Sequence, residues 1–314
     1  MDGIINVYKE KGFTSHDVVA KLRGILHQKK IGHTGTLDPD AVGVLPVCLG
    51  KATKVCELLS DRDKSYQAVC QLGVETDTQD TSGSIVRQGD YSQITAEQLE
   101  NCLGQFRGDI LQIPPMYSAK KIQGKKLYEI AREGKIVERK PQKIHIASLE
   151  LDNIDLEHGC FTMSVTCSKG TYIRTLCHDI GQQLGCLGAM SSLIRTRVSG
   201  FHLEDALTLS EIETLMREGE DFLFRRITSI DALFPEYPAF QIQREFAGKL
   251  ANGNPLLPRF LQQYHRQNSV CQEENQDTPD RLLAGDLLLV YDEEGKFKAI
   301  YQKGERELRV KKMF

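Results

Sequence analysis

The chain has few of the features that mark a membrane protein, a secreted disulfide scaffold or a metalloprotein. No apolar run approaches the ~20 residues that a membrane-spanning helix needs. The nine cysteines are scattered, without Cys-x-x-Cys pairs or zinc-type His/Cys spacing. The N-terminus opens without the basic segment and apolar core of a secretion signal. We therefore expect a cytoplasmic protein that holds no metal.

The remaining composition is that of an ordinary globular protein, but its charge is unevenly distributed. The 314 residues suit one large domain plus a small one, and the net charge is only −3. Residues 105–145 carry ten Lys/Arg against four acids, and residues 296–314 carry seven against two. Residues 271–294 carry eight acids against one arginine. This segregation favours two basic surfaces that face a polyanion, although such runs can also simply solvate exposed elements.

Two amphipathic patterns predict helices. Thr14 can cap a helix whose apolar residues recur at helical spacing through 18–26. A second helical pattern covers 173–184, and Gly185 is placed to end it.

Alternation of apolar and polar residues over 66–72 and 161–168 predicts half-buried strands. Such strands favour an antiparallel or mixed sheet over a doubly wound parallel one. Near the C-terminus, residues 287–291 and 296–301 flank a turn and predict a hairpin. The fold class that we expect is therefore α+β.

Two further segments bear on the domain organisation. The proline-bearing segment 234–238 marks the expected domain boundary. Residues 262–280 are rich in Gln, Asn and acids, which predicts a mobile loop.

The most informative segment is 32–46, with the sequence GHTGTLDPDAVGVLP. It places a carboxylate, Asp38, in a turn that glycines shape on both sides and that Pro39 stiffens. An acid held in this way is available to a substrate, but the same residues are also common in plain surface turns. A second acid, Asp40, follows two residues later, and we expect it to be solvated.

Segment 32–46, with its continuation to Lys54, resembles the signature of the TruB family of pseudouridine synthases. Further segments match that family in the same order, and the similarity runs from residue 4 to about 201. These are 6–9 (NVYK) with 12–15 (GFTS), 63–66 (DKSY), 113–120 (IPPMYSAK), 170–176 (GTYIRTL) and 193–196 (LIRT). Several segments in one order are far more specific than any single motif.

The resemblance implies an architecture. Residues 1–234 would form the pseudouridine-synthase catalytic domain, with a mixed, largely antiparallel sheet flanked by helices. A basic insertion at about 115–143 would clasp RNA, and residues 235–314 would form a small PUA-like RNA-binding β domain.

The resemblance also implies an activity, the isomerisation of uridine 55 in the T-arm loop of tRNA. The glycosidic bond to N1 breaks, the base rotates, and a bond forms between the sugar and C5 of the base. No electrons are exchanged, so no redox cofactor or metal is required. We expect a monomer that flips the target base out of the T-arm stem-loop without an obligatory protein partner.

The resemblance assigns catalysis to Asp38, Tyr66 and Arg174. Asp38 would act as a nucleophile or as a base toward the sugar, and the residues leave both roles open. Burial alone would raise the pKa of Asp38, and we expect the Arg174 guanidinium to reverse that shift. Tyr66 would pack on the base and help remove the C5 proton. By position alone, Arg174 could be an exposed helix residue and Tyr66 a core aromatic.

The resemblance assigns substrate binding to a further set of residues. One histidine would fill the space left by the flipped uridine, a leucine would line the base pocket, and a lysine near Tyr66 would be a second cation or a phosphate contact. These residues are His33, Leu193 and Lys64, with Tyr172, Lys9 and Lys120 as further contacts.

Two other functions remain open at this stage. One is an RNA chaperone that folds tRNA, with catalysis secondary or absent. The other is a guide-RNA-directed synthase of the dyskerin type. That type generally carries basic extensions, whereas this chain begins almost at its expected catalytic domain.

Overall fold

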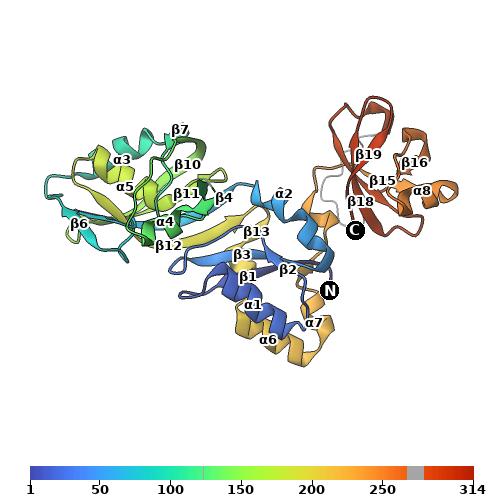
Figure 1. Ribbon diagram of the computed structural model, residues 1–314, viewed down its shortest axis with the longest axis horizontal. Helices are drawn as coiled ribbons and strands as arrows, with labels where there is room; N and C mark the ends of the chain where they lie inside the picture. Colours follow the sequence, from blue (N-terminus) through green and yellow to red (C-terminus); the bar gives the residue numbers. More distant parts are fainter. Residues whose placement is uncertain (123, 267–278) are drawn as a thin grey trace. The chain divides into compact units, whose positions relative to one another are not determined.

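The computed structural model describes residues 1–122, 124–266 and 279–314 (Figure 1). Most of the loop expected at 262–280 lies outside the described residues. The chain forms two compact units. The larger unit comprises residues 6–47 and 55–223, and the smaller comprises 1–5, 48–54 and 224–314. The sequence placed a domain boundary near residue 234. Whether the segments on either side of it fold independently stays a prediction.

A ten-stranded mixed sheet is the main framework. The main path of the sheet runs in the order β14-β1-β3-β12-β4-β11-β10-β7, with β13 added to β12 and β2 added to β3. The strands are β1 Gly3–Lys9, β2 Ile31–His33, β3 Val42–Leu49, β4 Lys64–Leu72, β7 Gly108–Gln112, β10 Gln142–Asp155, β11 Cys160–Cys167, β12 Gly188–Val198, β13 Phe201–His202 and β14 Ile227–Thr228.

The alternating patterns form the centre of this sheet, as predicted. On β4 and β11 the apolar set of each strand is buried and its polar partners are partly exposed. The pairing of β12 with β3 is parallel, whereas its pairing with β4 is antiparallel. A mixed sheet flanked by helices was expected, and the structure has it.

Eight α-helices occur in the described residues. They are α1 Ser15–Ile25, α2 Cys56–Ser60, α3 Ala96–Gly104, α4 Leu127–Arg132, α5 Ile173–Gln183, α6 Leu209–Glu218, α7 Glu220–Phe224 and α8 Ala247–Ala251. Thr14 caps α1 in a reciprocal bond with Asp17, as its position predicted. Gly185 follows the end of α5 with a φ of 75°, which glycine adopts without strain.

Helices α3 and α5 pack against the β4, β10, β11 and β12 region of the sheet (Figure 1). Their apolar faces and the strands enclose the core of the larger unit, which includes Leu176 and Ile180 of α5 and Met163 of β11. This packing fixes the start of α5 over the sheet.

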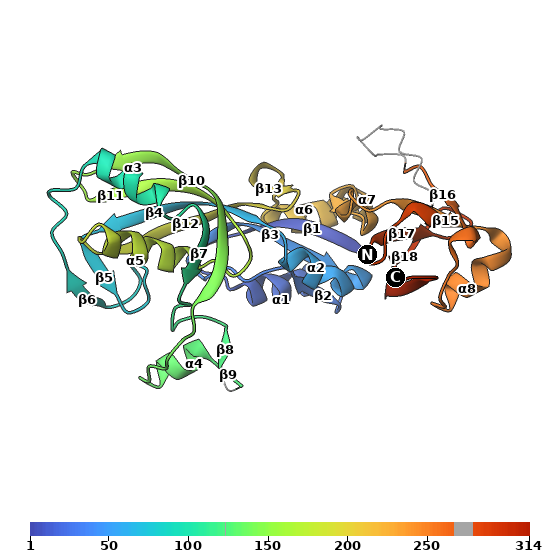
Figure 2. The same ribbon diagram turned by 90° about the horizontal axis from the view of Figure 1, so that it is seen from above.

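Two small ribbons extend from the larger unit. One pairs β5 Val74–Thr76 with β6 Ile85–Gln88, and the other pairs β8 Lys121–Ile122 with β9 Lys125–Lys126. The second ribbon and α4 form the basic insertion between β7 and β10. Figure 2 shows the insertion standing away from the sheet.

The smaller unit contains a five-stranded sheet in the order β16-β15-β17-β18-β19. Its strands are β15 Ala239–Ile242, β16 Leu261–Gln263, β17 Leu287–Tyr291, β18 Phe297–Lys303 and β19 Leu308–Met313. The predicted hairpin is the β17–β18 pair, and a separate apolar core surrounds Phe240 and Tyr301. The expected C-terminal β domain is thus present.

Candidate active site

Asp38 occupies the turn between β2 and β3, and its neighbours anchor this turn to the larger unit. Leu37 and Ala41 are buried in the core. The Leu37 N–H donates to Ser15 Oγ at 2.9 Å, and the Ala41 N–H donates to the Asp38 carbonyl at 3.1 Å. Because both flanks are fixed, the Asp38 carboxylate is held at the wall of a cleft.

Lys9 holds the same turn from β1. Its ammonium donates to the carbonyls of Glu10, Phe13 and Pro39 at 3.1, 2.7 and 3.0 Å. The residue has 0 % exposed surface, and burial lowers the pKa of its ammonium to about 8. Lys9 therefore has no surface to offer a substrate, which corrects the contact expected from the sequence. It ties the loop after β1 to the turn that carries Asp38.

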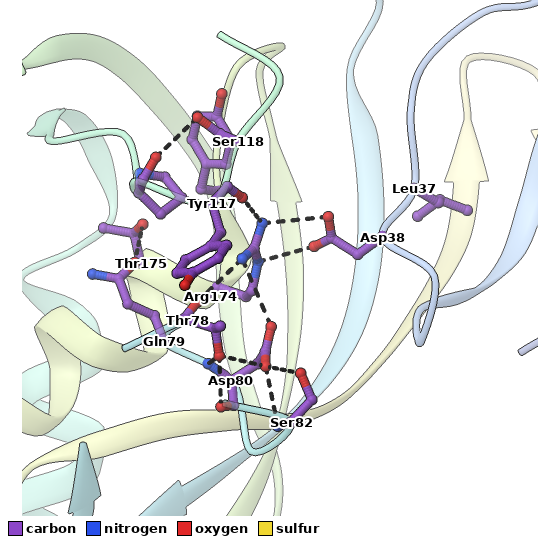
Figure 3. A network of polar contacts seen from close by, with 12 residues as sticks. Leu37, Asp38, Thr78, Gln79, Asp80, Ser82, Tyr117, Ser118, Arg174 and Thr175 are labelled. Carbon is purple, nitrogen blue, oxygen red and sulfur yellow. Dashed lines mark hydrogen bonds and ion pairs between the residues drawn. The ribbon is translucent and has the colours of Figure 1, made fainter. Parts of the chain in front are cut away.

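Arg174 lies opposite Asp38 at the start of α5 (Figure 3). Its Nε and Nη2 contact the two Asp38 carboxylate oxygens at 2.9 and 3.3 Å, which is a two-pronged ion pair. The remaining donors of Arg174 face the Thr78 carbonyl at 3.1 Å and the Tyr117 carbonyl at 2.8 Å. The Arg174 side chain is only 7 % exposed, so it is an inward residue rather than the exposed helix residue that its position also allowed.

A second carboxylate, Asp80, shares the Arg174 guanidinium. Asp80 Oδ2 lies 3.7 Å from Arg174 Nη1, and Thr78 Oγ1 donates to Asp80 Oδ1 at 2.8 Å. Asp80 sits in the loop between β5 and β6, beside Gln79, whose φ of 64° is unusual for a residue with a side chain. Sequence reasoning missed Asp80. The only signal was its position in a run of Asp, Thr, Ser and Gly typical of a tight polar loop.

The pKa of Asp38 is raised above the ordinary carboxyl value, which corrects an expectation. Burial is the largest cause, and the charge of Asp80 adds to it. Arg174 opposes the shift but does not reverse it. The Asp38 side chain keeps 40 % of its surface exposed to the cleft, but the cleft walls surround the carboxylate and replace most of its hydration.

A cleft of about 320 Å³ opens beside this ion pair, and we call it the Asp38 cleft. Tyr66, Tyr172 and Leu193 lie in its wall. The Gln112 side-chain amide holds Tyr172 by accepting from its N–H at 2.8 Å and donating to its carbonyl at 3.0 Å. The volume is at the lower end of the ~300–1,000 Å³ range of small-molecule pockets. A single nucleobase and sugar could enter, whereas a folded RNA could not.

Tyr66 is nearly buried on β4, where burial raises the pKa of its hydroxyl to about 12. The hydroxyl is therefore protonated at neutral pH. Tyr66 belongs both to the apolar core and to the cleft wall. The two positions considered from the sequence, a core aromatic and a residue that faces the substrate, are therefore compatible.

Arg195 connects Tyr66 with the Asp38 turn, and sequence reasoning did not single it out. Its Nε donates to the Val44 carbonyl at 2.7 Å, and its Nη atoms face the Gly35 and Thr36 carbonyls at 3.3 and 3.5 Å. A Cβ at Gly43 would come within 2.3 Å of the Arg195 carbonyl, so only glycine permits this strand pairing. The sole signal for Arg195 was its place in the motif at 193–196.

Lys64 also lines the cleft, but its ammonium is committed elsewhere. It donates to the carbonyls of Ser60 and Arg62 at 2.9 and 2.8 Å, at the end of α2. Burial lowers the pKa of Lys64 to about 8, and the nearby charge of Arg195 contributes.

The other two expected contacts lie outside the lining of the cleft. His33 ends β2, and its ring meets that of His16 edge to face at 5.3 Å. Burial lowers the pKa of His33, so the ring favours its neutral form. Lys120 lies in the basic insertion, where its carbonyl accepts from the Leu127 N–H. Asp40 is exposed, as predicted.

Comparison with known proteins identifies the family. Residues 23–173 match the family model described as TruB family pseudouridylate synthase (N terminal domain), and residues 174–234 match tRNA pseudouridylate synthase B C-terminal domain. The chain belongs to the TruB family of pseudouridylate synthases. It is therefore an isomerase that forms pseudouridine.

Two relatives named tRNA pseudouridine synthase B are similar over nearly their whole length. The Lachnoclostridium phytofermentans protein is 46 % identical, covering 98 % of this chain and 97 % of the relative. The Caldanaerobacter subterraneus subsp. tengcongensis protein is 42 % identical, covering 100 % and 99 %. The fold is similar to a chain in the crystal structure of a Cbf5-Nop10-Gar1 complex, with a TM-score of 0.72 and 25 % identity over 99 % of this chain and 84 % of that one.

Two further observations concern the described residues alone. They contain no cluster of three or more His, Cys, Asp or Glu side chains arranged to hold a metal ion. They also contain no helix with the length and apolar character that crossing a membrane requires.

Proposed function

We propose that this pseudouridine synthase acts on tRNA and converts the uridine at position 55 of the T-arm loop. The observation that carries the proposal is the two-pronged Asp38–Arg174 ion pair at the wall of a cleft sized for one nucleoside. The tRNA substrate is supported by the names of the relatives, and the T-arm position by the motif resemblance.

The size of the cleft requires the target nucleotide to leave the RNA stack. Unstacking costs a few kcal/mol, and the enzyme repays it with contacts in the cleft. The apolar side chain of Leu193 and the ring of Tyr66 offer surfaces to the base, beside the carboxylate that meets the sugar. The neutral ring of His33, on the strand that leads into the Asp38 turn, is suited to stack in the gap left in the RNA.

Asp38 is the group that acts on the sugar, either by attack at C1′ or by removal of the C2′ proton. Arg174 fixes both carboxylate oxygens, so one geometry is presented to the nucleoside. A deuterium isotope effect from the C2′ position separates the two roles, because only proton removal breaks that C–H bond.

RNA affinity comes from surfaces outside the cleft. The insertion carries an excess of Lys and Arg, among them Lys120, and phosphate contacts there would give salt-sensitive binding. The five-stranded sheet of the smaller unit would act as a PUA-like RNA-binding module. We further propose that the enzyme works in the cytoplasm as a monomer, without an obligatory protein partner.

Asp38→Asn tests the proposal. Isomerisation replaces the C5–H bond with a C–C bond, so tritium at C5 of uridine is released to water. We expect the variant to bind a tRNA transcript normally in a filter assay but to release no tritium. Asp40→Asn is the matched control, because it changes an exposed acid two residues away, and it should react like wild type. Wild-type release by Asp38→Asn would refute the role of this carboxylate.

The resemblance in fold to the Cbf5 chain makes guide-RNA-dependent action the second candidate. Release of C5 tritium from a tRNA transcript by the purified protein alone would exclude a need for a guide RNA or partner. A strict requirement for an added ribonucleoprotein would favour the second candidate instead. Comparing tRNA annealing by Asp38→Asn with wild type measures any chaperone activity separately.

A further inference from the structure

Arg195 and Tyr66 form a direct pair across two strands. They are opposite partners in the antiparallel pairing of β12 with β4, so their side chains leave the same face of the sheet. Both line the Asp38 cleft. The Tyr66 hydroxyl interacts with the Arg195 guanidinium and raises its pKa, whereas burial lowers it.

Arg195 is a buried cation without a carboxylate partner in the part of the chain that the structure describes. Its exposed surface is 1 %, and its hydrogen bonds go to the backbone carbonyls of Gly35, Thr36 and Val44. Carbonyl dipoles satisfy the N–H groups but leave the charge uncompensated. A buried charge of this kind costs several kcal/mol unless an opposite charge offsets it.

The other cations of the cleft cannot take its place beside Tyr66. Arg174 is committed to Asp38, Asp80 and two backbone carbonyls. The ammonium of Lys64 is committed to the carbonyls at the end of α2. Among the arginines of the cleft wall in the described residues, Arg195 is therefore the one without a carboxylate partner, and its cross-strand neighbour is the phenol of Tyr66.

We propose that Arg195 is a positioning residue that acts through Tyr66 by stabilising the phenolate that removes the C5 proton. The inference rests on the proposed function and adds a group to it. The Tyr66 O–H first loses its proton to water. After the sugar–C5 bond has formed, the C5–H bond breaks, its electron pair returns to the pyrimidine ring, and the proton passes to the phenolate oxygen. Tyr66 is thereby restored to its neutral form.

The titration of Tyr66 agrees with this arrangement. Burial raises the pKa of the hydroxyl, and Arg195 is the leading influence that lowers it. Without the guanidinium, the phenolate would form still less readily. An opposite charge within ~4–6 Å typically shifts a pKa by about 1–3 units.

Two substitutions separate the charge from the carbonyl contacts. Arg195→Met removes both, whereas Arg195→Lys keeps the charge and gives up the planar fork that holds three carbonyls. We expect tritium release to fall by about 10-fold or more in Arg195→Met, from the pKa shift, and to recover substantially in Arg195→Lys. A C5-deuterium isotope effect should be larger in Arg195→Met than in wild type, because C5 deprotonation then limits the rate. Equal loss in both variants with an unchanged isotope effect would assign Arg195 to the fold alone.

A double-mutant cycle with Tyr66→Phe shows whether the effect passes through Tyr66. Arg195→Met should slow the reaction little further once the hydroxyl is gone, whereas a purely structural role predicts additive losses. Arg197→Met is the matched control, because Arg197 lies on the same strand and donates to Ser65 Oγ and the Ser199 carbonyl. It should leave both the rate and the isotope effect unchanged.

A measurement without turnover keeps this inference separate from the proposed function. In protein labelled with 3-fluorotyrosine, the ¹⁹F resonance of residue 66 is assigned by its loss in Tyr66→Phe. Its titration midpoint should rise in Arg195→Met and rise less in Arg195→Lys. An unchanged midpoint would overturn the inference even if the enzyme is active. A raised midpoint would support the electrostatic pairing even if the RNA substrate had been misassigned.

Discussion

Two arginines lie in the wall of the same cleft, and their surroundings differ in kind. Arg174 meets two carboxylates and two carbonyls. Arg195 meets three carbonyls and a tyrosine hydroxyl. The charge of the first is balanced in the resting protein. The second would be balanced only when, in the proposed reaction, Tyr66 becomes an anion.

The two arginines illustrate two uses of a buried cation. One pairs with a carboxylate that is already charged, and the other, in our proposal, stabilises an anion that forms during the reaction. The Asp38–Arg174 pair is set before substrate arrives and gives the carboxylate a fixed direction. The Arg195–Tyr66 pair stores an unfavourable charge that the fold supports through backbone carbonyls. At both arginines the stability of the fold is therefore coupled to the chemistry of the site.

The strongest way to break the balanced pair is Arg174→Met. Arg174 fixes the direction of the Asp38 carboxylate, and misplacing a catalytic group can cost about 100-fold in rate, so we expect tritium release to fall by about 100-fold. The pKa of Asp38 should rise further, because Arg174 is the main influence that lowers it. Activity requires the charged carboxylate and is lost as the pH falls through this pKa. The acid limb of the pH–rate profile should therefore move to higher pH.

The control for this substitution is Arg217→Met, which removes an exposed arginine from α6. It should leave the profile in place. An acid limb that stays at its wild-type position in Arg174→Met would contradict the electrostatic coupling.

Asp80→Asn sharpens the comparison, because it should move the same limb in the opposite direction. Asp80 raises the pKa of Asp38, so its neutralisation should lower that pKa and shift the acid limb to lower pH. The rate should fall by about 10-fold, because Arg174 loses one of the carboxylates that position it but keeps its ion pair with Asp38. A pH–rate profile measures both effects.

Asp77→Asn is the companion control in the same loop, where Asp77 Oδ1 accepts from the Ser84 N–H. The Asp77→Asn substitution perturbs the same loop but keeps the Asp80 carboxylate beside Arg174. If both variants shift the limb alike, loop structure rather than the Asp80 charge is responsible.

Lys9→Met tests the support of the Asp38 turn rather than its chemistry. The substitution leaves the Glu10, Phe13 and Pro39 carbonyls without their donor, which should cost about 1–3 kcal/mol of unfolding free energy. Urea denaturation measures the loss. Lys11→Met, at an exposed position on the same loop, should have almost no effect. A Lys9→Met protein that is as stable as wild type but binds RNA poorly would restore the substrate contact first expected.

The smallest effect is expected outside the cleft, at Lys120→Gln. One lost phosphate contact should weaken tRNA binding by a few-fold and reduce the salt slope by about 1, with the chemical step unchanged. Binding across a salt series measures it, with Lys29→Gln as the control on a different exposed segment. An unchanged slope would remove Lys120 from the RNA contacts.

Much of the framework follows from local pattern. Alternation over 66–72 predicts β4, because a strand buried on one face requires that period. Helical spacing and a terminal glycine likewise predict α5. The resemblance selected Asp38, Tyr66, Tyr172, Arg174 and Leu193, all of which the structure brings to one cleft. Their chemical roles stay predictions.

Local sequence pattern did not predict which partners the charged side chains contact in the folded protein. Lys9 looked like a substrate contact, yet it is fully buried on carbonyls. Asp80 was not predicted at all, yet it shares the Arg174 guanidinium with Asp38. The pKa of Asp38 is raised because the effect of burial is larger than the opposing effect of the Arg174 guanidinium. None of these can be read from neighbours in the sequence.

The amino-acid order by itself determined which segments become strands and helices, and which acid stands in the motif turn, because periodicity and turn chemistry act over a few residues. Only the tertiary structure decided that, within the described part of the chain, Arg174 has two carboxylate neighbours and Arg195 has none. That outcome depends on which distant segments the sheet brings together, here the parallel pairing of β3 with β12 and the antiparallel pairing of β12 with β4. The charge at each point of the cleft is the sum of such distant contributions.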